Sequence, residues 1–228
     1  MFDLLLPFFL LLLFLLSLSI IWRINARKYI SSGTVASAYD AWTQDKLLER
    51  LWGEHIHLGF YSSGKKNIDF RKAKVQFVHE LVKWSGLDKL PKGSRILDVG
   101  CGIGGSSRIL AKYYGFNVTG ITISPAQVKR ARELTPCEIS CNFQVMDALD
   151  LKFEDGAFDA VWSVEAGAHM NDKSKFANEI LRTLRPGGYL ALADWNSRDL
   201  RKYPPSFFEK LVLNQLLEQW VHPNFISI

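Results

Sequence analysis

The chain has 228 residues, of which 48% are hydrophobic and 22% are charged, and its formal net charge is +5. This balance is that of a globular protein rather than a disordered one, and the length suffices for one domain and an additional segment. No stretch resembles a nucleic-acid-binding module, so no nucleic-acid partner is expected. The cysteines lack the second pair that a zinc site needs, which favours free thiols in a reducing compartment and no metal; they are Cys101, Cys137 and Cys141.

An uncharged apolar run, Leu4 to Trp22, stands near the start of the chain. As a helix, its 19 residues would be about 28 Å long, close to the thickness of about 30 Å of the hydrocarbon core of a bilayer. Asp3 precedes the run and Arg23 follows it, whereas a cleaved signal peptide begins with basic residues and ends with small ones. We therefore expect residues 1–22 to form a transmembrane anchor, with a signal peptide or a peripheral hairpin as the alternatives.

Basic residues follow this run directly, and no Lys or Arg precedes it; they are Arg23, Arg27 and Lys28. Since positive charge collects on the cytoplasmic side of a membrane span, the rest of the chain is expected on the cytoplasmic (or stromal) face. Residues 23–92 then hold an aromatic- and histidine-rich segment, followed from Asn67 to Trp84 by apolar positions at helical spacing. We expect this region to form an N-terminal cap with helices.

Beyond Pro91, short apolar runs alternate with segments of helical spacing. Strands are expected at Arg95–Val99, Asn117–Ile123, Asn142–Val145, Phe158–Ser163 and Tyr189–Ala193. Helices are expected at Ser106–Tyr114, Pro125–Leu134 and Lys173–Leu184. Strands and helices that alternate at these lengths are typical of a parallel sheet covered on both faces. Residues 93–197 are therefore predicted to form a doubly wound α/β core.

The sequence ILDVGCGIGG, which ends at Gly105, stands where the first strand of this core turns into its first helix. Glycines there let a ligand approach the backbone N–H groups of the helix start. Gly100, Gly102 and Gly105 also fit the dinucleotide pattern G-x-G-x-x-G. That site needs an acidic residue about 20 positions later, and none occurs between Asp98 and Glu133. Because Asp98 suits the ammonium group of S-adenosylmethionine (SAM) and would repel a pyrophosphate, the motif favours a SAM site.

Four further stretches extend this pattern: Leu51–Gly59, Val118–Gln127, Trp162–Met170 and Arg185–Trp195. With the glycine motif, they resemble the tocopherol-type C-methyltransferases, and among these the branch that methylates 2-methyl-6-phytyl-1,4-benzoquinol. The resemblance runs from about Ser31 to the last residue. The glycine motif marks only the superfamily, whereas the stretch before Gly59 and the block from Glu165 to His169 are more specific. Ala168 departs from the family, because one branch carries Glu at this position and the other carries Pro.

The resemblance implies a Rossmann-like class I methyltransferase sheet, which usually has about seven strands. Fewer strands are predicted here, and family members continue for roughly a further third of the chain, so the C-terminal strands are expected to be missing. Ser206 and Glu209 have the spacing of a capping box, which opens an amphipathic helix that ends near Val221. Residues 198–228 are expected to be the start of a helical substrate lid.

The resemblance also implies a set of SAM-binding residues. The methionine end of SAM would be held by Asp98, Gly100, Gly102 and Gly104. Thr122 and Gln127 would meet the ribose, Asp147 and Ala148 the adenine, and Tyr39 and Tyr61 would close over the cofactor. Each position has a structural alternative: Ser124 to Gln127 is also a capping box, Asp147 suits a turn, and the tyrosines suit a core.

A prenylated hydroquinone is the substrate that the resemblance implies. Its ring becomes strongly nucleophilic when a phenolic proton, with a pKa of about 10, is removed. A base with a pKa near neutrality would help this step. His169 is the first candidate, with Glu165 to orient it or to accept the other hydroxyl. His55 and His57 are the second candidates, in a segment expected over the mouth of the site.

Other functions stay open at this point. A related enzyme could methylate another lipid, such as a sterol or an unsaturated acyl chain. A membrane-tethered module that binds SAM without activity is the third alternative. The membrane anchor fits a prenylated substrate, because each buried CH₂ group contributes about 0.8 kcal/mol to membrane binding. The oligomeric state does not follow from the sequence.

Overall fold

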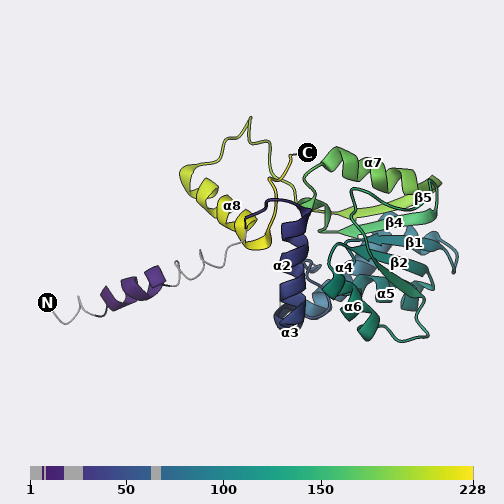
Figure 1. Ribbon diagram of the computed structural model, residues 1–228. Helices are drawn as coiled ribbons and strands as arrows, with labels where there is room; N and C mark the ends of the chain where they lie inside the picture. The colour runs from purple at the N-terminus through teal and green to yellow at the C-terminus, as the bar shows by residue number, and fades with distance from the viewer. Residues whose placement is uncertain (1–6, 8, 18–27, 63–67, 228) are drawn as a thin grey trace.

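The computed structural model describes residues 7, 9–17, 28–62 and 68–227. The body of the described structure is a sheet of five parallel strands in the order β3-β2-β1-β4-β5, with helices on both faces (Figure 1). The strands are β1 (Arg95–Val99), β2 (Asn117–Thr122), β3 (Cys141–Val145), β4 (Phe158–Val164) and β5 (Leu184–Ala193). The predicted doubly wound α/β core is confirmed, and β5 alone begins several residues before its predicted start at Tyr189.

Helices α4 (Phe70–Ser85), α5 (Gly105–Tyr114) and α6 (Pro125–Leu134) lie along one face of the sheet, and α7 (Lys173–Thr183) lies along the other (Figure 1). Two short 3-10 helices, η1 (Leu87–Lys89) and η2 (Gly167–His169), complete this part of the chain. Capping side chains set three of the helix starts: Asp69, Ser124 and Asp172 each accept a hydrogen bond from a backbone N–H of the first turn. All four helices agree with their predicted ranges to within a few residues.

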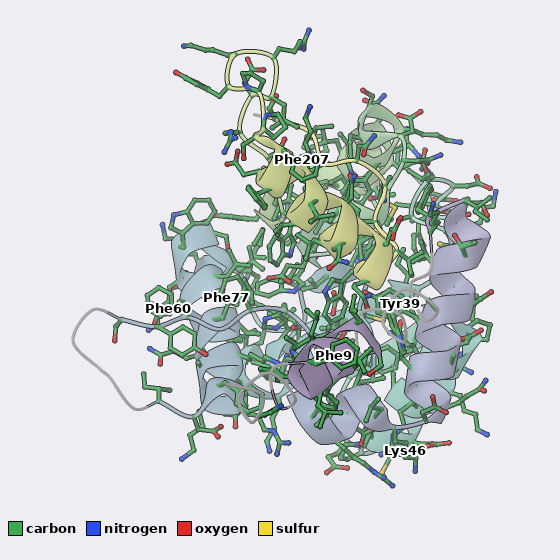
Figure 2. The ribbon with its side chains drawn as sticks, turned by 90° about the vertical axis from the view of Figure 1, so that its left-hand side faces the viewer. Phe9, Tyr39, Lys46, Phe60, Phe77 and Phe207 are labelled. Atoms are coloured by element: carbon green, nitrogen blue, oxygen red, sulfur yellow. The ribbon has the colours of Figure 1, made fainter. Side chains whose placement is uncertain are left out.

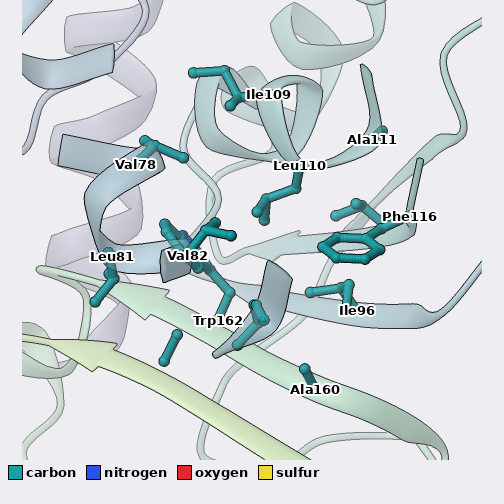
Figure 3. Packing of buried hydrophobic residues seen from close by; sticks show 13 residues of the cluster. Val78, Leu81, Val82, Ile96, Ile109, Leu110, Ala111, Phe116, Ala160 and Trp162 are labelled. Atoms are coloured by element: carbon teal, nitrogen blue, oxygen red, sulfur yellow. The ribbon is translucent and has the colours of Figure 1, made fainter. Parts of the chain in front are cut away.

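The core is continuous through the sheet because β1 is buried on both faces. Figure 3 shows the cluster on the α4 and α5 side, where Val82 and Leu110 pack with Ile96 and Trp162, all of them fully buried. Successive side chains of a strand point to opposite faces, so Leu97 joins the second cluster, which α7 covers. The carboxyl end of β1 is held between the two clusters, and this packing sets the position at which the following loop begins.

Three more helices lie beside the carboxyl edge of the sheet: α2 (Ser32–Gln44), α3 (Leu47–Trp52) and α8 (Phe207–Trp220). The predicted capping box opens α8, since the Ser206 hydroxyl accepts a hydrogen bond from the backbone N–H of Glu209 and the Glu209 carboxylate accepts one from the backbone N–H of Ser206. Phe207 lies at the start of α8, and Tyr39 of α2 lies near its other end (Figure 2). The sequence predicts a helical cap in this region, without bounds for α2 and α3.

Helix α2 is fixed to the start of α6 by one carboxylate. Asp40 accepts hydrogen bonds from the Ser124 hydroxyl, at 2.5 Å, and from the backbone N–H of Ala126, at 3.0 Å. Helix α3 is attached to α6 as well, because Arg130 of α6 donates two hydrogen bonds to the carboxylate of Glu49 in α3. The N-terminal helices are therefore attached to the element that follows β2, next to the carboxyl edge.

The predicted anchor, residues 1–22, lies largely outside the described residues. Residues 9–17 are helical, and the large apolar side chains from Phe9 to Leu16 are 46–59% exposed. Among the helices in the described ranges, none is both long and apolar enough to cross a membrane. The anchor stays a prediction.

Candidate active site

A cavity of about 380 Å³ lies at the carboxyl edge of the sheet. The chain passes from β1 to β2 on one side and later returns to form β4 on the other side of β1, so the loops after β1 and β4 diverge there. Open α/β sheets bind their ligands at such a point, and the volume suits a small organic molecule. Most of the predicted site residues line the cavity: Tyr39, His55, His57, Asp98, Gly100, Gly102, Thr122, Gln127, Asp147, Ala148, Glu165 and His169.

The glycines between β1 and α5 have different roles. Gly102 has a φ of +55°, and a Cβ there would meet no atom within 4 Å, so this glycine leaves space open above the loop. Gly100, with a φ of +78°, allows close approach to Ala166 in the loop after β4. Gly104 does not line the cavity, and a Cβ there would lie 2.7 Å from the Phe143 ring. The prediction that Gly104 holds a ligand is corrected: this glycine permits a φ of +81° and packing against Phe143.

Asp98, near the end of β1, supplies a buried carboxylate to the cavity. Its side chain is 2% exposed, and its Oδ2 accepts a hydrogen bond of 2.5 Å from the Ser107 hydroxyl of α5. Burial raises the pKa of Asp98 to about 7, although the hydrogen bond from Ser107 lowers it. A cationic group brought into the cavity would favour the ionised form of this carboxylate.

Thr122 and Gln127 meet beside the cavity at the end of β2. The Thr122 hydroxyl donates a hydrogen bond of 2.6 Å to Gln127 Oε1, and both side chains are buried. Only half of the expected capping box forms: the Gln127 backbone N–H donates to Ser124 Oγ, but the Gln127 side chain turns to Thr122 instead. Asp147 makes the expected turn contact, accepting from the Leu149 N–H at 2.9 Å, and it still lines the cavity.

His169 is engaged at both of its ring nitrogens. Nδ1 lies 3.4 Å from the Val221 carbonyl oxygen, so it carries the proton, and Nε2 accepts a hydrogen bond of 2.9 Å from the Tyr39 hydroxyl. Burial is the main cause that lowers the pKa of His169 to about 3, and the neighbouring His222 adds to it. The pKa of His169 therefore lies below the near-neutral value that was expected for the base.

Glu165, the residue after β4, has an unusual backbone conformation for a non-glycine residue, with a φ of +53°. Its Oε1 accepts a hydrogen bond of 3.0 Å from the backbone N–H of Leu58, so it holds the segment of His55 and His57. Among the described contacts Glu165 does not hydrogen-bond His169, and the expected orienting role is corrected. Burial is the main cause that raises the pKa of Tyr39, and the negative charge of Glu165 raises it further. The Glu165 carboxylate therefore lies near the Tyr39 hydroxyl.

Residues 53–59, which we call the cap segment, lie against the glycine-rich loop between β1 and α5. A Cβ on Gly105 would stand 2.5 Å from the Glu54 carbonyl oxygen, so the two segments pack backbone against backbone. His55 and His57 are both buried here, 3.1 Å apart between Nδ1 and Nε2. Burial lowers their pKa values to about 3 and about 4. Both histidines line the cavity as neutral side chains, and their role in catalysis stays a prediction.

The structure also shows what the sequence analysis missed. Tyr61 lies outside the cavity with its side chain 55% exposed, so it does not close over a ligand there. An aromatic wall comes instead from the N-terminal helices and from the C-terminal segment: Trp52, Trp195, Trp220, His222 and Phe225. In the described ranges no three His, Cys, Asp or Glu side chains gather as metal ligands would. The aromatic density of residues 195–225 was the available signal.

The chain is similar in sequence and in fold to known proteins. Residues 97–192 match the family model described as a methyltransferase domain. The chain is 60% identical over 208 residues to the 2-methyl-6-phytyl-1,4-hydroquinone methyltransferase of Synechocystis, covering 91% of this chain and 65% of that protein. It is 38% identical over 193 residues to the chloroplastic tocopherol O-methyltransferase of Arabidopsis thaliana, covering 79% of this chain and 56% of that protein.

A solved structure of geranyl diphosphate methyltransferase in complex with GPP and sinefungin is 25% identical, with a TM-score of 0.67. The match covers 86% of this chain and 76% of that one. The chain thus spans less than two thirds of the length of both curated relatives.

Proposed function

Because this chain belongs to the SAM-dependent methyltransferases of the tocopherol type, we propose that it methylates a ring carbon of a prenylated benzoquinol. The substrate is 2-methyl-6-phytyl-1,4-benzoquinol or a close relative. The observation that carries this proposal is the cavity at the switch point, which is lined by a buried carboxylate, the open position at Gly102, a tyrosine, a glutamate and histidines.

The residues present fit SAM. Asp98 offers a carboxylate to its ammonium group, and Gly102 leaves the space that a ligand beside the loop needs. Gln127 and Asp147 line the same cavity at the ends of β2 and β3, where the ribose and the adenine would lie. When bound, SAM supplies an electrophilic methyl group on a sulfonium. Residues of the chain itself bind and position the substrate and accept its proton.

His169 binds the substrate hydroxyl region but does not hold the phenolic proton. Both ring nitrogens of His169 are already engaged, Nε2 by the Tyr39 hydroxyl and Nδ1 by the Val221 carbonyl oxygen, so this side chain has no free lone pair for that proton. The carboxylate of Glu165, whose negative charge raises the pKa of Tyr39, is the proton acceptor in this proposal. Tyr39 and His169 fix the hydroxyl beside it.

We also propose that the chain acts at a membrane. The apolar run from Leu4 to Trp22 supports an anchor, and the basic residues after it support a catalytic domain on the cytoplasmic (or stromal) face. A prenyl tail keeps the quinol in the bilayer, at about 0.8 kcal/mol for each buried CH₂. An anchored enzyme therefore meets its substrate far more often than a free one.

Transfer of labelled methyl groups tests this function. The purified chain is incubated with methyl-labelled SAM and, separately, with a prenylated hydroquinol, a sterol and an unsaturated phospholipid. Label in the hydroquinol alone is the expected result. Label in the sterol or the acyl chain would favour the alternative of another lipid. Binding of SAM without label in any acceptor would favour the module without activity.

A further inference from the structure

Helix α8 carries apolar side chains on two faces. Leu216 and Trp220, four residues apart and therefore on one face of the helix, line the cavity. The first two turns carry further large apolar side chains, which do not line the cavity and are between 45% and 76% exposed. We call them the outer face of α8: Phe207, Phe208, Leu211 and Val212. A large exposed apolar patch marks an interaction site, so the outer face fits a partner of low polarity.

Basic side chains surround the outer face. From Arg198 to Val212 the chain has four basic residues and two acidic ones. Both acidic side chains are engaged, because Glu209 pairs with Arg198 at 2.8 Å and Asp199 accepts hydrogen bonds from the backbone N–H groups of residues 201 and 202. The other basic side chains are exposed; they are Arg201, Lys202 and Lys210. Exposed phenylalanines beside a net positive charge are complementary to a surface of anionic lipid.

The residues that follow the predicted anchor contact the same side of α8. Lys28 forms a salt bridge of 3.7 Å with Glu218, which stands seven residues after Leu211 and so shares its helix face. Tyr29 packs against the hydrophobic cluster that includes Val221, directly after α8. The chain is therefore fixed beside α8 from residue 28 onward.

The distance from this point to the predicted anchor is short. Lys28 is the sixth residue after Trp22, and six residues span at most about 22 Å in any conformation. Helix α8 has nearly the same length, about 21 Å for its 14 residues. Figure 1 shows α8 on the same side of the molecule as residues 9–17. A bilayer that holds the apolar run is therefore within reach of the outer face.

We propose that the outer face of α8 docks on a membrane surface that contains anionic lipids. This inference rests on the proposed function, which attaches the chain to a membrane, and adds to it a second contact and an orientation. The apolar side chains enter the boundary between headgroups and acyl chains, and the basic ones remain among the headgroups. Such a contact is reversible and is weakened by salt, so α8 orients a chain that the apolar run anchors. Because Leu216 and Trp220 line the cavity, docking brings the cavity close to the bilayer that holds a prenyl tail.

The test measures whether α8 meets lipid in the full 228-residue chain. The exposed Cys137 is replaced by Ser, and Val212→Cys then carries a fluorophore that a lipid-bound nitroxide quenches on contact. The chain is bound to vesicles of phosphatidylcholine with or without phosphatidylglycerol. The label at residue 212 is expected to be quenched in the anionic vesicles, and less in the neutral ones. The matched control, Tyr113→Cys, is 63% exposed near the start of β2, at the opposite edge of the sheet, and should not be quenched in either.

A charge substitution tests the contribution of the basic residues. Arg201→Gln together with Lys202→Gln should lower the docking equilibrium at residue 212 about 30-fold in anionic vesicles, because each basic residue near such a surface contributes about 5-fold. The control is Lys92→Gln together with Lys112→Gln, which removes the same charge from exposed positions near the opposite edge of the sheet and should leave the quenching unchanged.

The other outcomes separate this inference from the proposed function. An unquenched label at residue 212 in vesicles that have bound the chain, or equal quenching at residue 113, would overturn docking through α8 and leave the proposed function intact. A signal at residue 212 that follows protein concentration and not lipid would assign the outer face to a second copy of the chain and would also overturn membrane docking. A chain that does not bind vesicles would overturn the proposed membrane attachment, and this inference with it.

Discussion

Four histidines line the cavity, and burial lowers the pKa of each of them to about 3 or about 4; they are His55, His57, His169 and His222. A sequence shows the imidazoles but not their burial, so His169 was expected to be a base near neutrality. Its two hydrogen bonds and its stacked neighbour depend on residues 39, 221 and 222. Contacts over such separations in sequence were not predictable.

The substitution Glu165→Gln tests whether the proton acceptor is the Glu165 carboxylate or the His169 imidazole. The variant should lose about 10²–10⁴-fold in turnover near pH 7, the usual contribution of a general base. The loss should shrink as the pH approaches 10, where solvent ionises the phenol without help. His169→Gln keeps an amide near the position of Nε2 and should lose less than 10-fold. The reverse order of the two losses would return the base to His169.

Asp98 gives a pH dependence to cofactor binding. Its pKa in the free protein is raised to about 7, so the carboxylate is mostly ionised at pH 8 and mostly protonated at pH 6. Only the ionised form attracts an ammonium group. The affinity for S-adenosylhomocysteine should therefore fall about 10-fold as the pH is lowered from 8 to 6. Calorimetry on wild type and on Asp98→Asn checks this; the variant should bind weakly, with no such dependence, and a flat wild-type profile would refute the assignment.

At the scale of elements, the strands and helices after residue 92 were predictable because each has a clear hydrophobic period and a recognisable start. The N-terminal helices were expected only as part of a helical cap, without bounds for α2 and α3, although Val35, Ala38 and Trp42 of α2 have helical spacing and Ser31 begins a capping box. Gly33 weakens that signal, and the six residues of α3 are too few to show a period. These helices depend on contacts with α6, which a local pattern does not contain.

Lys74 of α4 positions the cap segment. Its buried amino group donates hydrogen bonds to the Trp52 and His55 carbonyl oxygens, at 3.2 and 2.8 Å. Hydrogen bonds from a charged donor each contribute about 1.5–3 kcal/mol, so Lys74→Met should speed amide hydrogen exchange across residues 52–58 by at least about 10-fold. Lys72→Met, at an exposed position of the same helix, is the matched control. Equal protection in both variants would show that other contacts hold the cap segment.

At the scale of the whole molecule, the cavity joins segments from most of the described chain, and the membrane attachment depends on the first residues. Deleting residues 1–28 removes the apolar run and its basic neighbours. The shortened protein should leave the membrane fraction and keep its affinity for SAM, since the cavity is built from residue 32 onward. Sedimentation with vesicles after a high-salt wash is the measurement. A shortened protein that still sediments would place the main attachment elsewhere.

The position of the new methyl group tests the central claim most directly. Purified protein is supplied with SAM and 2-methyl-6-phytyl-1,4-hydroquinone, and the product is examined by proton NMR and by reversible oxidation. We predict one additional ring methyl, one fewer ring proton and two free hydroxyls, so that the product still oxidises to a quinone. A methyl ether, which would block that oxidation, or an unmethylated hydroquinone recovered beside bound SAM, would contradict methyl transfer to carbon in this cavity.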